Sequence, residues 1–241
     1  MKVILLLILI FLTINSIADE ALFEKANLAY DRAEIAQAII LYDSILSNGV
    51  ESSQIYYNLG NCYYKKNDWA NAIWHYEKSL KINNSKKTRE NLHLTKKNII
   101  DKIKDLPQIF YKKWWTSLYD FLSTKQWQYL AILSIILALI LLVINQTTKK
   151  DLKKYYISAI SSSLLILLIS NSSYYHKIEK KEAIIFSSTS IKSAPSLNSN
   201  EIFSLHSGTK IEIIDRIEDW VHFTISDGKS GWLLKNSIKE L

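Results

Sequence analysis

Hydrophobic residues are spaced in three different ways along the 241 residues of the chain. Between residues 19 and 104 they recur every three or four positions, which is the spacing of amphipathic helices. Two long apolar runs follow at residues 127–144 and 155–175, and short apolar-rich runs separated by polar loops fill residues 183–241. This pattern predicts a multidomain protein with α-helical hairpins, a pair of apolar helices and a small all-β domain.

An internal repeat organises the helical segment. Ala38 and Tyr42 recur 34 positions later as Ala72 and Tyr76, and a fixed period of this size is typical of stacked helix-turn-helix units. Small residues such as Gly60 let the two helices of a hairpin approach closely, and aromatic side chains fill the surrounding space. The residues expected to pack between the repeat helices are Ala26, Ala38, Tyr42, Leu59, Gly60, Tyr63, Ala72 and Tyr76.

The second repeat, residues 53–86, resembles the tetratricopeptide repeat family in its succession of Leu59-Gly60, Tyr63, Ala72 and Tyr76. Its first copy, residues 19–52, is degenerate, with Ala26 in place of the Gly. Residues 87–104 are predicted to form one further helix that caps the stack. Because such stacks normally need roughly three units to be stable, we expect the stability of this domain to depend on a partner, on self-association or on the membrane.

Some tetratricopeptide domains clamp a terminal carboxylate with paired Asn and basic side chains. Asn27 and Asn58 have the spacing of the two Asn residues. The basic positions are instead occupied by Phe23, Thr88 and Leu92. A clamp is therefore the weaker interpretation, and Asn27, Asn58 and Asn61, which mark a possible partner groove, are expected mainly to bond backbone and neighbouring helices.

Residues 1–18 have the pattern of a signal peptide, since Lys2 precedes a short apolar run and the small residues Ser16 and Ala18 follow it. An uncleaved membrane anchor is the alternative. Residues 127–144 carry no charge and are predicted to be transmembrane helix 1; residues 155–175 are predicted to be helix 2 of a two-helix transmembrane hairpin. Serine residues dilute this second span and can hydrogen-bond to their own helix or to the first span, so the two spans are expected to pack along this small-residue face.

The loop at residues 145–154 is rich in lysine, which favours a cytoplasmic position. With an exported N-terminus, both terminal domains are then expected in the periplasm, anchored in the inner membrane and its lipid bilayer. Residues 105–126 are both aromatic and basic, which indicates an interfacial segment; the alternative is the aromatic seam of a soluble core. The side chains expected at the membrane interface are Trp114, Trp115 and Trp127.

Residues 183–241 resemble the bacterial SH3-like family. The resemblance rests on Leu205 with Gly208-Thr209, on Asp219-Trp220-Val221, and on Asp227-Gly228 with Gly231-Trp232. It implies a small all-β barrel. Trp220 and Trp232 are expected to pack in this barrel, and the alternative is that they form ligand platforms. Domains of this family often bind cell-wall peptides or other proteins.

Composition narrows the function further. The net charge of +7 is spread over the membrane flanks and residues 78–104, so we expect no nucleic-acid partner; a solvated helix face or attraction to anionic lipids or an acidic partner accounts for the basic stretch. Cys62 is the sole cysteine and is expected to be a buried apolar residue rather than a reactive thiol. No phosphate loop, metal-ligand spacing or nucleophile motif occurs, so we expect no enzyme, cofactor, metal or small-molecule substrate.

The order of the parts, including the motif at residues 106–115, resembles the repeat-bearing member of the Bat (Bacteroides aerotolerance) family. This resemblance implies partners among membrane proteins that carry von Willebrand factor A domains, and a link to a MoxR-type ATPase and to stress tolerance. The sequence thus predicts a membrane-anchored scaffold for protein–protein interaction. The alternative is a cell-wall protein that binds or senses peptidoglycan through its SH3-like domain.

Overall fold

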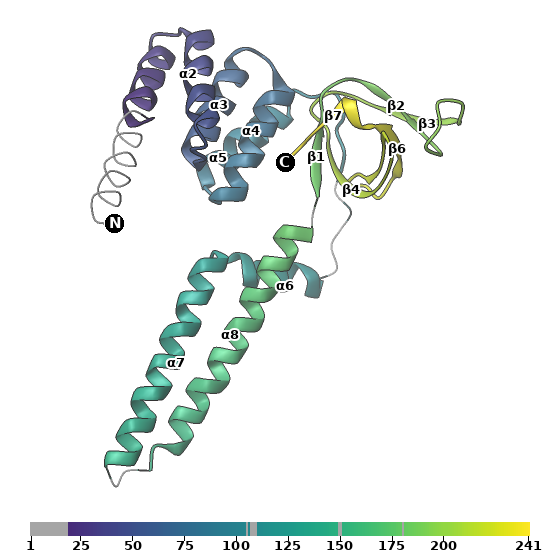
Figure 1. The fold of residues 1–241 in the computed structure, drawn as a ribbon. Coiled ribbons are helices and arrows are strands. Elements are labelled where there is room, and N and C mark those ends of the chain that lie inside the picture. The colour runs from purple at the N-terminus through teal and green to yellow at the C-terminus, as the bar shows by residue number, and fades with distance from the viewer. Residues whose placement is uncertain (1–18, 105, 107–109, 149–150, 180) are drawn as a thin grey trace, which may run out of the picture. The chain divides into compact units, whose positions relative to one another are not determined.

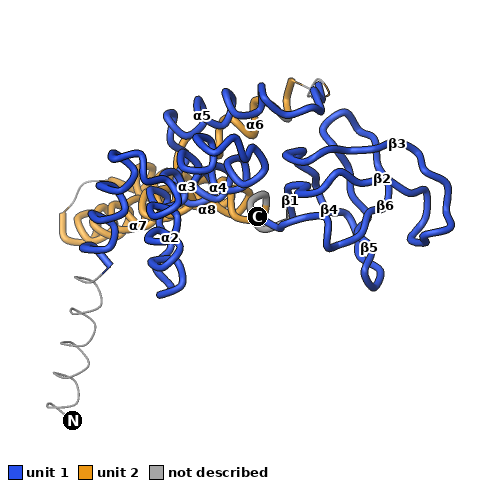
Figure 2. The backbone as a smooth tube through the Cα atoms, turned by 90° about the horizontal axis from the view of Figure 1, so that it is seen from above, with its two compact units in different colours: residues 1–105, 181–241 blue, residues 106–180 orange. Residues whose placement is uncertain are grey.

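The computed structural model describes residues 19–104, 106, 110–148, 151–179 and 181–241 (Figure 1). The predicted signal peptide lies outside the described residues. The chain divides into two compact units, Met1–Asp105 with Lys181–Leu241, and Leu106–Lys180 (Figure 2). The first unit therefore combines two segments that are separated in sequence by the whole of the second.

The N-terminal part of the first unit is a stack of helices. Residues 19–31 are helical, and α2 (Ile35–Ser47), α3 (Ser53–Lys65), α4 (Trp69–Ile82) and α5 (Lys86–Lys96) follow. The side chain of Ser52 caps α3 by accepting a hydrogen bond from the backbone of Ile55, and Asp68 caps α4 in the same way. Asn67 in the turn between them has a φ of 59°, a left-handed conformation that Asn tolerates well.

The residues predicted to pack between the repeat helices lie in the interior of this stack, seven of them buried and Tyr63 half-buried. Gly60 is required by the close approach of α3 and α4. A Cβ atom at this position would lie 2.5 Å from the ring of Tyr76, so any larger residue would push the helices apart.

The cap helix is shorter than the sequence suggests. We expected it to extend over residues 87–104, but α5 ends at Lys96 and residues 97–104 form turns and an irregular segment. The physical reason lies in the apolar residues of this segment, which pack elsewhere. Ile103 packs against the core of the C-terminal domain, and Ile99 contacts the position where Gly208 lacks a side chain.

The C-terminal part of the first unit is an antiparallel β domain. Its strands are β1 (Glu182–Ile185), β2 (Thr189–Lys192), β3 (Glu201–Leu205), β4 (Lys210–Ile217), β5 (Trp220–Thr224), β6 (Ser230–Leu234) and β7 (Ile238–Glu240), with a short 3₁₀ helix at Lys235–Ser237. The strand order is β3-β2-β6-β5-β4-β1-β7. Along β5, Val221 and Phe223 are buried in the core, whereas the alternate residues are only half-buried.

The second unit consists of α6 (Phe110–Asp120), α7 (Thr124–Thr147) and α8 (Lys153–Glu179). Both α7 and α8 are long and apolar enough to cross a membrane. They lie side by side, and the expected serine contacts between them are confirmed: Ser134 Oγ lies 2.9 Å from Ser162 Oγ, and Ser163 donates to the carbonyl of Ala131. The predicted fold class of α-helical hairpins, two apolar helices and a small all-β domain is thus confirmed.

The three tryptophans expected at the membrane interface differ in exposure. Trp114 and Trp115 on α6 are 71% and 42% exposed. Trp127 is buried instead, and its indole nitrogen donates to the carbonyl of Tyr119 at 3.1 Å. Trp127 therefore joins α7 to α6 within this unit, because its indole N–H finds a partner on the neighbouring helix.

Candidate functional site

A groove runs along residues 19–31, α3 and α5, and we call it the repeat groove. It contains two hollows of about 370 and 290 Å³, which share Tyr30 and Asn61 in their lining. The three asparagines singled out from the sequence, Asn27, Asn58 and Asn61, all line the larger hollow. The structure thus brings the candidate groove residues together.

Two small hydrogen-bond networks hold these asparagines. In the first, Asn58 Nδ2 donates to Asn27 Oδ1 at 3.1 Å and to the hydroxyl of Tyr42 at 3.0 Å, and that hydroxyl donates to Asn27 Oδ1 at 2.6 Å. Burial raises the pKa of Tyr42 to about 12, so its hydroxyl stays protonated and acts as a donor. The network joins the first helix to α2 and α3.

The second network lies one repeat further along. Asn91 Nδ2 donates to Asn61 Oδ1 at 2.9 Å and to the hydroxyl of Tyr57 at 3.0 Å, while the hydroxyl of Tyr76 donates to Asn61 Oδ1 at 2.7 Å. Burial also raises the pKa of Tyr76. This network joins α3, α4 and α5.

Each of these asparagines uses only one end of its side-chain amide. Among the described residues, no hydrogen bond involves the nitrogen of Asn27 or Asn61, or the oxygen of Asn58 or Asn91. An amide can use both its carbonyl and its two N–H groups. The groove therefore retains two unused donor groups and two unused acceptors.

Two lysines line the groove as well. Lys87 Nζ lies 5.0 Å from the ring centre of Tyr57, and Lys65 Nζ lies 3.9 Å from that of Tyr30. Sequence reasoning missed both lysines, and Asn91, because it considered only the clamp positions of the repeat family. Two of those positions, Thr88 and Leu92, are buried. The spacing of Lys87 and Asn91, one turn apart on α5, is the signal that could have found them.

On the side of α4 that faces away from the repeat groove, the helix contacts the β domain. Residues 97–104 contact the β domain as well. We call this contact surface, formed by α4 and residues 97–104 with the β domain, the seam. Glu77 is buried there, and its two carboxylate oxygens each lie 2.9 Å from a lysine, Lys96 and Lys210. Lys210 also lies 3.0 Å from Glu182. Burial alone would raise the pKa of Glu77, but the two lysines outweigh it and the pKa is lowered.

A second polar contact of the seam is made by Asp101. Its carboxylate accepts hydrogen bonds from the backbone N–H of His206 at 2.7 Å and from the hydroxyl of Thr209 at 2.6 Å, and it lies 2.8 Å from His206 Nδ1. Burial alone would raise the pKa of Asp101, but these hydrogen bonds lower it by more than burial raises it, so the pKa of Asp101 is lowered overall. The carboxylate is therefore bound in its charged form.

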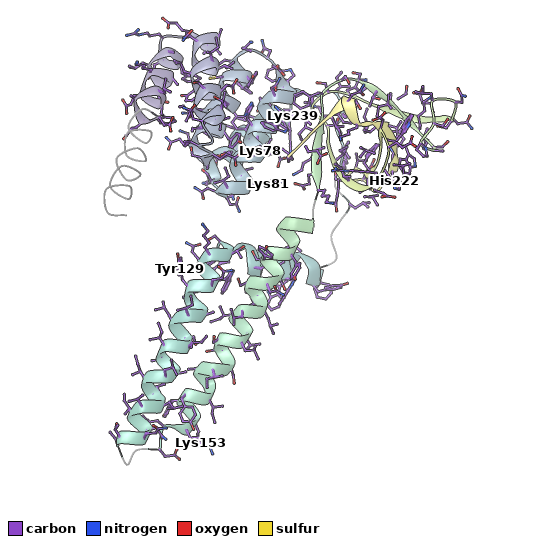
Figure 3. The ribbon with its side chains drawn as sticks, in the orientation of Figure 1. Lys78, Lys81, Tyr129, Lys153, His222 and Lys239 are labelled. Atoms are coloured by element: carbon purple, nitrogen blue, oxygen red, sulfur yellow. The ribbon has the colours of Figure 1, made fainter. Side chains whose placement is uncertain are left out.

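Aromatic and apolar contacts complete the seam. Trp74 donates its indole N–H to the carbonyl of Glu240 at 2.8 Å, and Lys239 Nζ lies 3.6 Å from the centre of the Trp74 ring. Lys239 lies near Lys78 and Lys81 at this junction (Figure 3). Ile73, Trp74 and Leu92 form one buried cluster with Ile184 of the β domain. The β domain of the same chain therefore supports the short repeat stack, while support from a partner, from self-association or from the membrane stays a prediction.

Two further side chains that could carry chemistry, Cys62 and His75, are buried. Cys62 is fully buried, and burial raises the pKa of its thiol to about 12, as expected for a packing residue rather than a nucleophile. His75 is also buried, stacks on Tyr63 with ring centres 5.1 Å apart, and has its pKa lowered to about 3 by burial. The described residues contain no group of three or more His, Cys, Asp or Glu side chains that could hold a metal.

Comparison with known proteins identifies both modules of the first unit. The tetratricopeptide repeat model matches residues 53–85, and the bacterial SH3 domain model matches residues 187–239. No curated protein matches the chain. The chain therefore contains a tetratricopeptide repeat and a bacterial SH3 domain, modules that typically mediate protein–protein interaction or peptidoglycan-related binding and are typically non-catalytic.

Solved structures similar to this chain include the C-terminal SH3 domain of Myosin IB from Entamoeba histolytica, with 21% identity over 26% of this chain and 95% of that chain, at a TM-score of 0.21. The same domain bound to an EhFP10(GEF) peptide matches with 21% identity over 26% of this chain and 93% of that chain, also at a TM-score of 0.21.

Proposed function

We propose that the protein is a membrane-anchored scaffold whose repeat groove binds an extended segment of a partner protein. The observation that carries this proposal is the set of unused amide groups on Asn27, Asn58, Asn61 and Asn91. An extended peptide presents N–H and C=O groups along its length, and such groups can pair with side-chain donors and acceptors along a groove. The tyrosines around them offer rigid contact area at low entropic cost.

The seam supports a particular membrane arrangement. The repeats and the β domain pack together, although both apolar helices lie between them in sequence. If α7 and α8 cross a membrane, the two packed domains must lie on the same side of it, which requires an even number of crossings. We therefore propose a two-span hairpin whose lysine-rich loop faces the cytoplasm. The predicted signal peptide would place both domains in the periplasm.

The biological setting that we propose follows from the resemblance of the chain to BatE, the repeat-bearing protein of the Bat (Bacteroides aerotolerance) set. In that setting the partners are membrane proteins with von Willebrand factor A domains, and the complex is connected with stress tolerance. The unused groups of the groove support a protein partner in general, and the resemblance supplies its class.

Site-specific photocrosslinking in intact membranes tests the groove. A crosslinking residue at Gln54, which lines the groove, should capture a partner protein, and the double variant Asn58→Ala with Asn61→Ala should abolish that product. A crosslinker at Glu90, exposed on α5 outside the groove lining, is the matched control. Equal capture from Gln54 and Glu90, or capture that survives the double variant, would count against the proposal.

Binding of peptidoglycan by the β domain is a second candidate, and one observation favours it. Trp220, His222 and Trp232 lie on the face of β5 and β6 that points away from the core, and the rings of His222 and Trp232 stack with centres 4.8 Å apart. Stacked aromatic side chains can serve as a platform for a ligand. Detergent-solubilised full-length protein should then co-sediment with purified sacculi, and the Trp232→Ala variant should not. If the unaltered protein fails to co-sediment, peptidoglycan binding by the β domain is excluded.

A further inference from the structure

We infer that docking of the β domain holds α5, one wall of the repeat groove, in place. The β domain would then control the shape of the groove from the opposite side of the helix stack. This inference concerns regulation of the groove and rests on the function proposed for it. The interaction surface involved is the seam, and the partner at this surface is the chain's own C-terminal domain.

The helix α5 has little intrinsic stability and depends on its packing against the rest of the first unit. It spans only 11 residues, and its N-cap Ser85 makes no side-chain capping bond. Isolated helices of this length are marginal in water. Its buried residues are Thr88, Leu92 and Thr95. Nevertheless α5 supplies Lys87 and Asn91 to the groove, so the position of the helix determines whether the second asparagine network can form.

The C-terminal end of α5 is fastened by side chains that the seam holds. Lys96, the last residue of the helix, pairs with Glu77, and the same carboxylate binds Lys210 of the β domain. The ammonium group of Lys102 donates to the carbonyls of Lys96 and Lys97, two of the carbonyls that the helix end leaves unpaired. Glu77, which holds Lys96, contacts the β domain directly, and Lys102 follows Asp101, which also contacts it.

The segment that carries Lys102 is itself fixed by the β domain. Asp101 binds His206 and Thr209, and Ile103 packs against the β-domain core. Ile99 lies so close to Gly208 that a Cβ there would approach its methyl group to 2.5 Å. A continuous chain of contacts thus leads from the β domain through residues 97–104 to α5 and Asn91. By thermodynamic linkage, a peptide that bridges α3 and α5 would in turn favour docking.

Hydrogen exchange of the full-length protein in detergent, read by mass spectrometry, tests this inference without a ligand. Gly208→Ala should wedge the seam at Ile99, and Asp101→Asn should weaken it from the repeat side. We expect the amides of α5 to exchange at least tenfold faster in both variants, together with residues 97–104, while α2 keeps its protection. Gly49→Ala is the matched control, because Gly49 has a similar positive φ of 85° but nothing within 4 Å of its Cβ position.

Unchanged exchange of α5 in both variants overturns the inference. If Gly208→Ala also speeds the exchange of β4 and β5, the β domain itself is destabilised and the Asp101→Asn variant decides, since Asp101 lies outside that domain. Faster exchange of α5 in Asp101→Asn then supports the inference, and unchanged exchange overturns it. Because no partner is added, failure here would leave the crosslinking test of the groove untouched. The two proposals can therefore fail separately.

Discussion

The repeat groove and the seam lie on opposite sides of α4 and are both rich in polar groups, but they differ in how these groups are satisfied. At the seam, each carboxylate oxygen of Glu77 has a lysine partner, and Asp101 accepts hydrogen bonds from His206 and Thr209. In the groove, half of each asparagine amide is unused within the described residues. The comparison distinguishes a surface whose polar groups are paired within the chain from one whose polar groups remain available to a ligand.

Burial explains the difference. A polar group that is removed from water must be paired, because leaving it unsatisfied costs roughly 1–3 kcal/mol. The carboxylates of Glu77 and Asp101 at the seam are largely buried, so their charges are matched within the chain. The groove is open, so water can satisfy the free amide ends at little cost until a partner displaces it. Four predictions test this distinction, beginning with the largest expected effect.

Removal of a seam carboxylate should be the most damaging change. Glu77→Ala leaves Lys96 and Lys210 without their shared partner, and breaking such a buried arrangement should cost about 2–4 kcal/mol, somewhat below the fully buried case because both lysines are partly exposed. Denaturant unfolding in detergent, followed by circular dichroism, measures it. Glu90→Ala, which breaks the exposed pair with Lys86, should cost less than about 0.5 kcal/mol. Similar losses in the two variants would refute the importance of the seam.

A wedge between the repeat helices should have the next largest effect. Gly60→Leu forces a side chain into the ring of Tyr76 and should cost about 1–3 kcal/mol. Because Tyr76 also holds Asn61, capture of a partner from the crosslinker at Gln54 should fall in parallel. Stability reduced with capture intact would show that the groove does not depend on this hairpin.

Acid should destabilise the first unit through His75 before it affects the carboxylates. The pKa of His75 is lowered from 6.5 to about 3 by burial, so below pH 6.5 the unfolded chain binds a proton that the folded chain does not. Stability should therefore fall by about 1–2 kcal/mol between pH 7 and pH 5. Glu77 and Asp101 have lowered pKa values, so their contributions are lost only below their ordinary values of 4.5 and 3.8.

The control for this pH dependence is His75→Phe, which keeps an aromatic ring beside Tyr63 but cannot bind a proton. Unfolding measured at pH 7, 6 and 5 should give a flatter profile in this variant than in the unaltered protein. An identical slope in the two proteins would assign the acid sensitivity to other groups.

The smallest effect on stability is expected in the groove. Asn58→Ala removes two hydrogen bonds in a partly exposed site and should cost about 1 kcal/mol or less. Partner crosslinking from Gln54 should nevertheless be strongly reduced, since an unused acceptor of the groove is lost with the side chain. A large stability loss with undiminished crosslinking would mean that this asparagine serves the fold alone.

Local sequence patterns predicted most of the elements but not the seam. The 34-residue period and the apolar runs were enough to find α3, α4, α7 and α8. The seam is formed by residues separated by 105, 133 and 166 positions, and no periodicity links such distant residues. Ile99 and Ile103 are spaced as on a helix, so the cap helix was predicted too long. Strands β2, β3 and β7 are short and partly polar, and no apolar run marked them.

The groove was predictable only in part. Asn27 and Asn58 could be found because the repeat family fixes their spacing, and Asn61 recurs one period after Asn27. Asn91 and Lys87 could not be found in this way, because they lie on α5, where the sequence has left the repeat pattern. Their place in the groove follows from how α5 packs against α4, through Leu92 and its neighbours.

Cysteine accessibility in spheroplasts tests most directly whether the two docked domains share one side of a membrane. In a Cys62→Ala background, single cysteines would be introduced by Lys66→Cys in the repeats, Lys229→Cys in the β domain and Asp151→Cys between α7 and α8. A membrane-impermeant maleimide should label the first two and leave the third unlabelled until the membrane is opened. Labelling of only one of the two domains would contradict a docked pair held by a two-span hairpin.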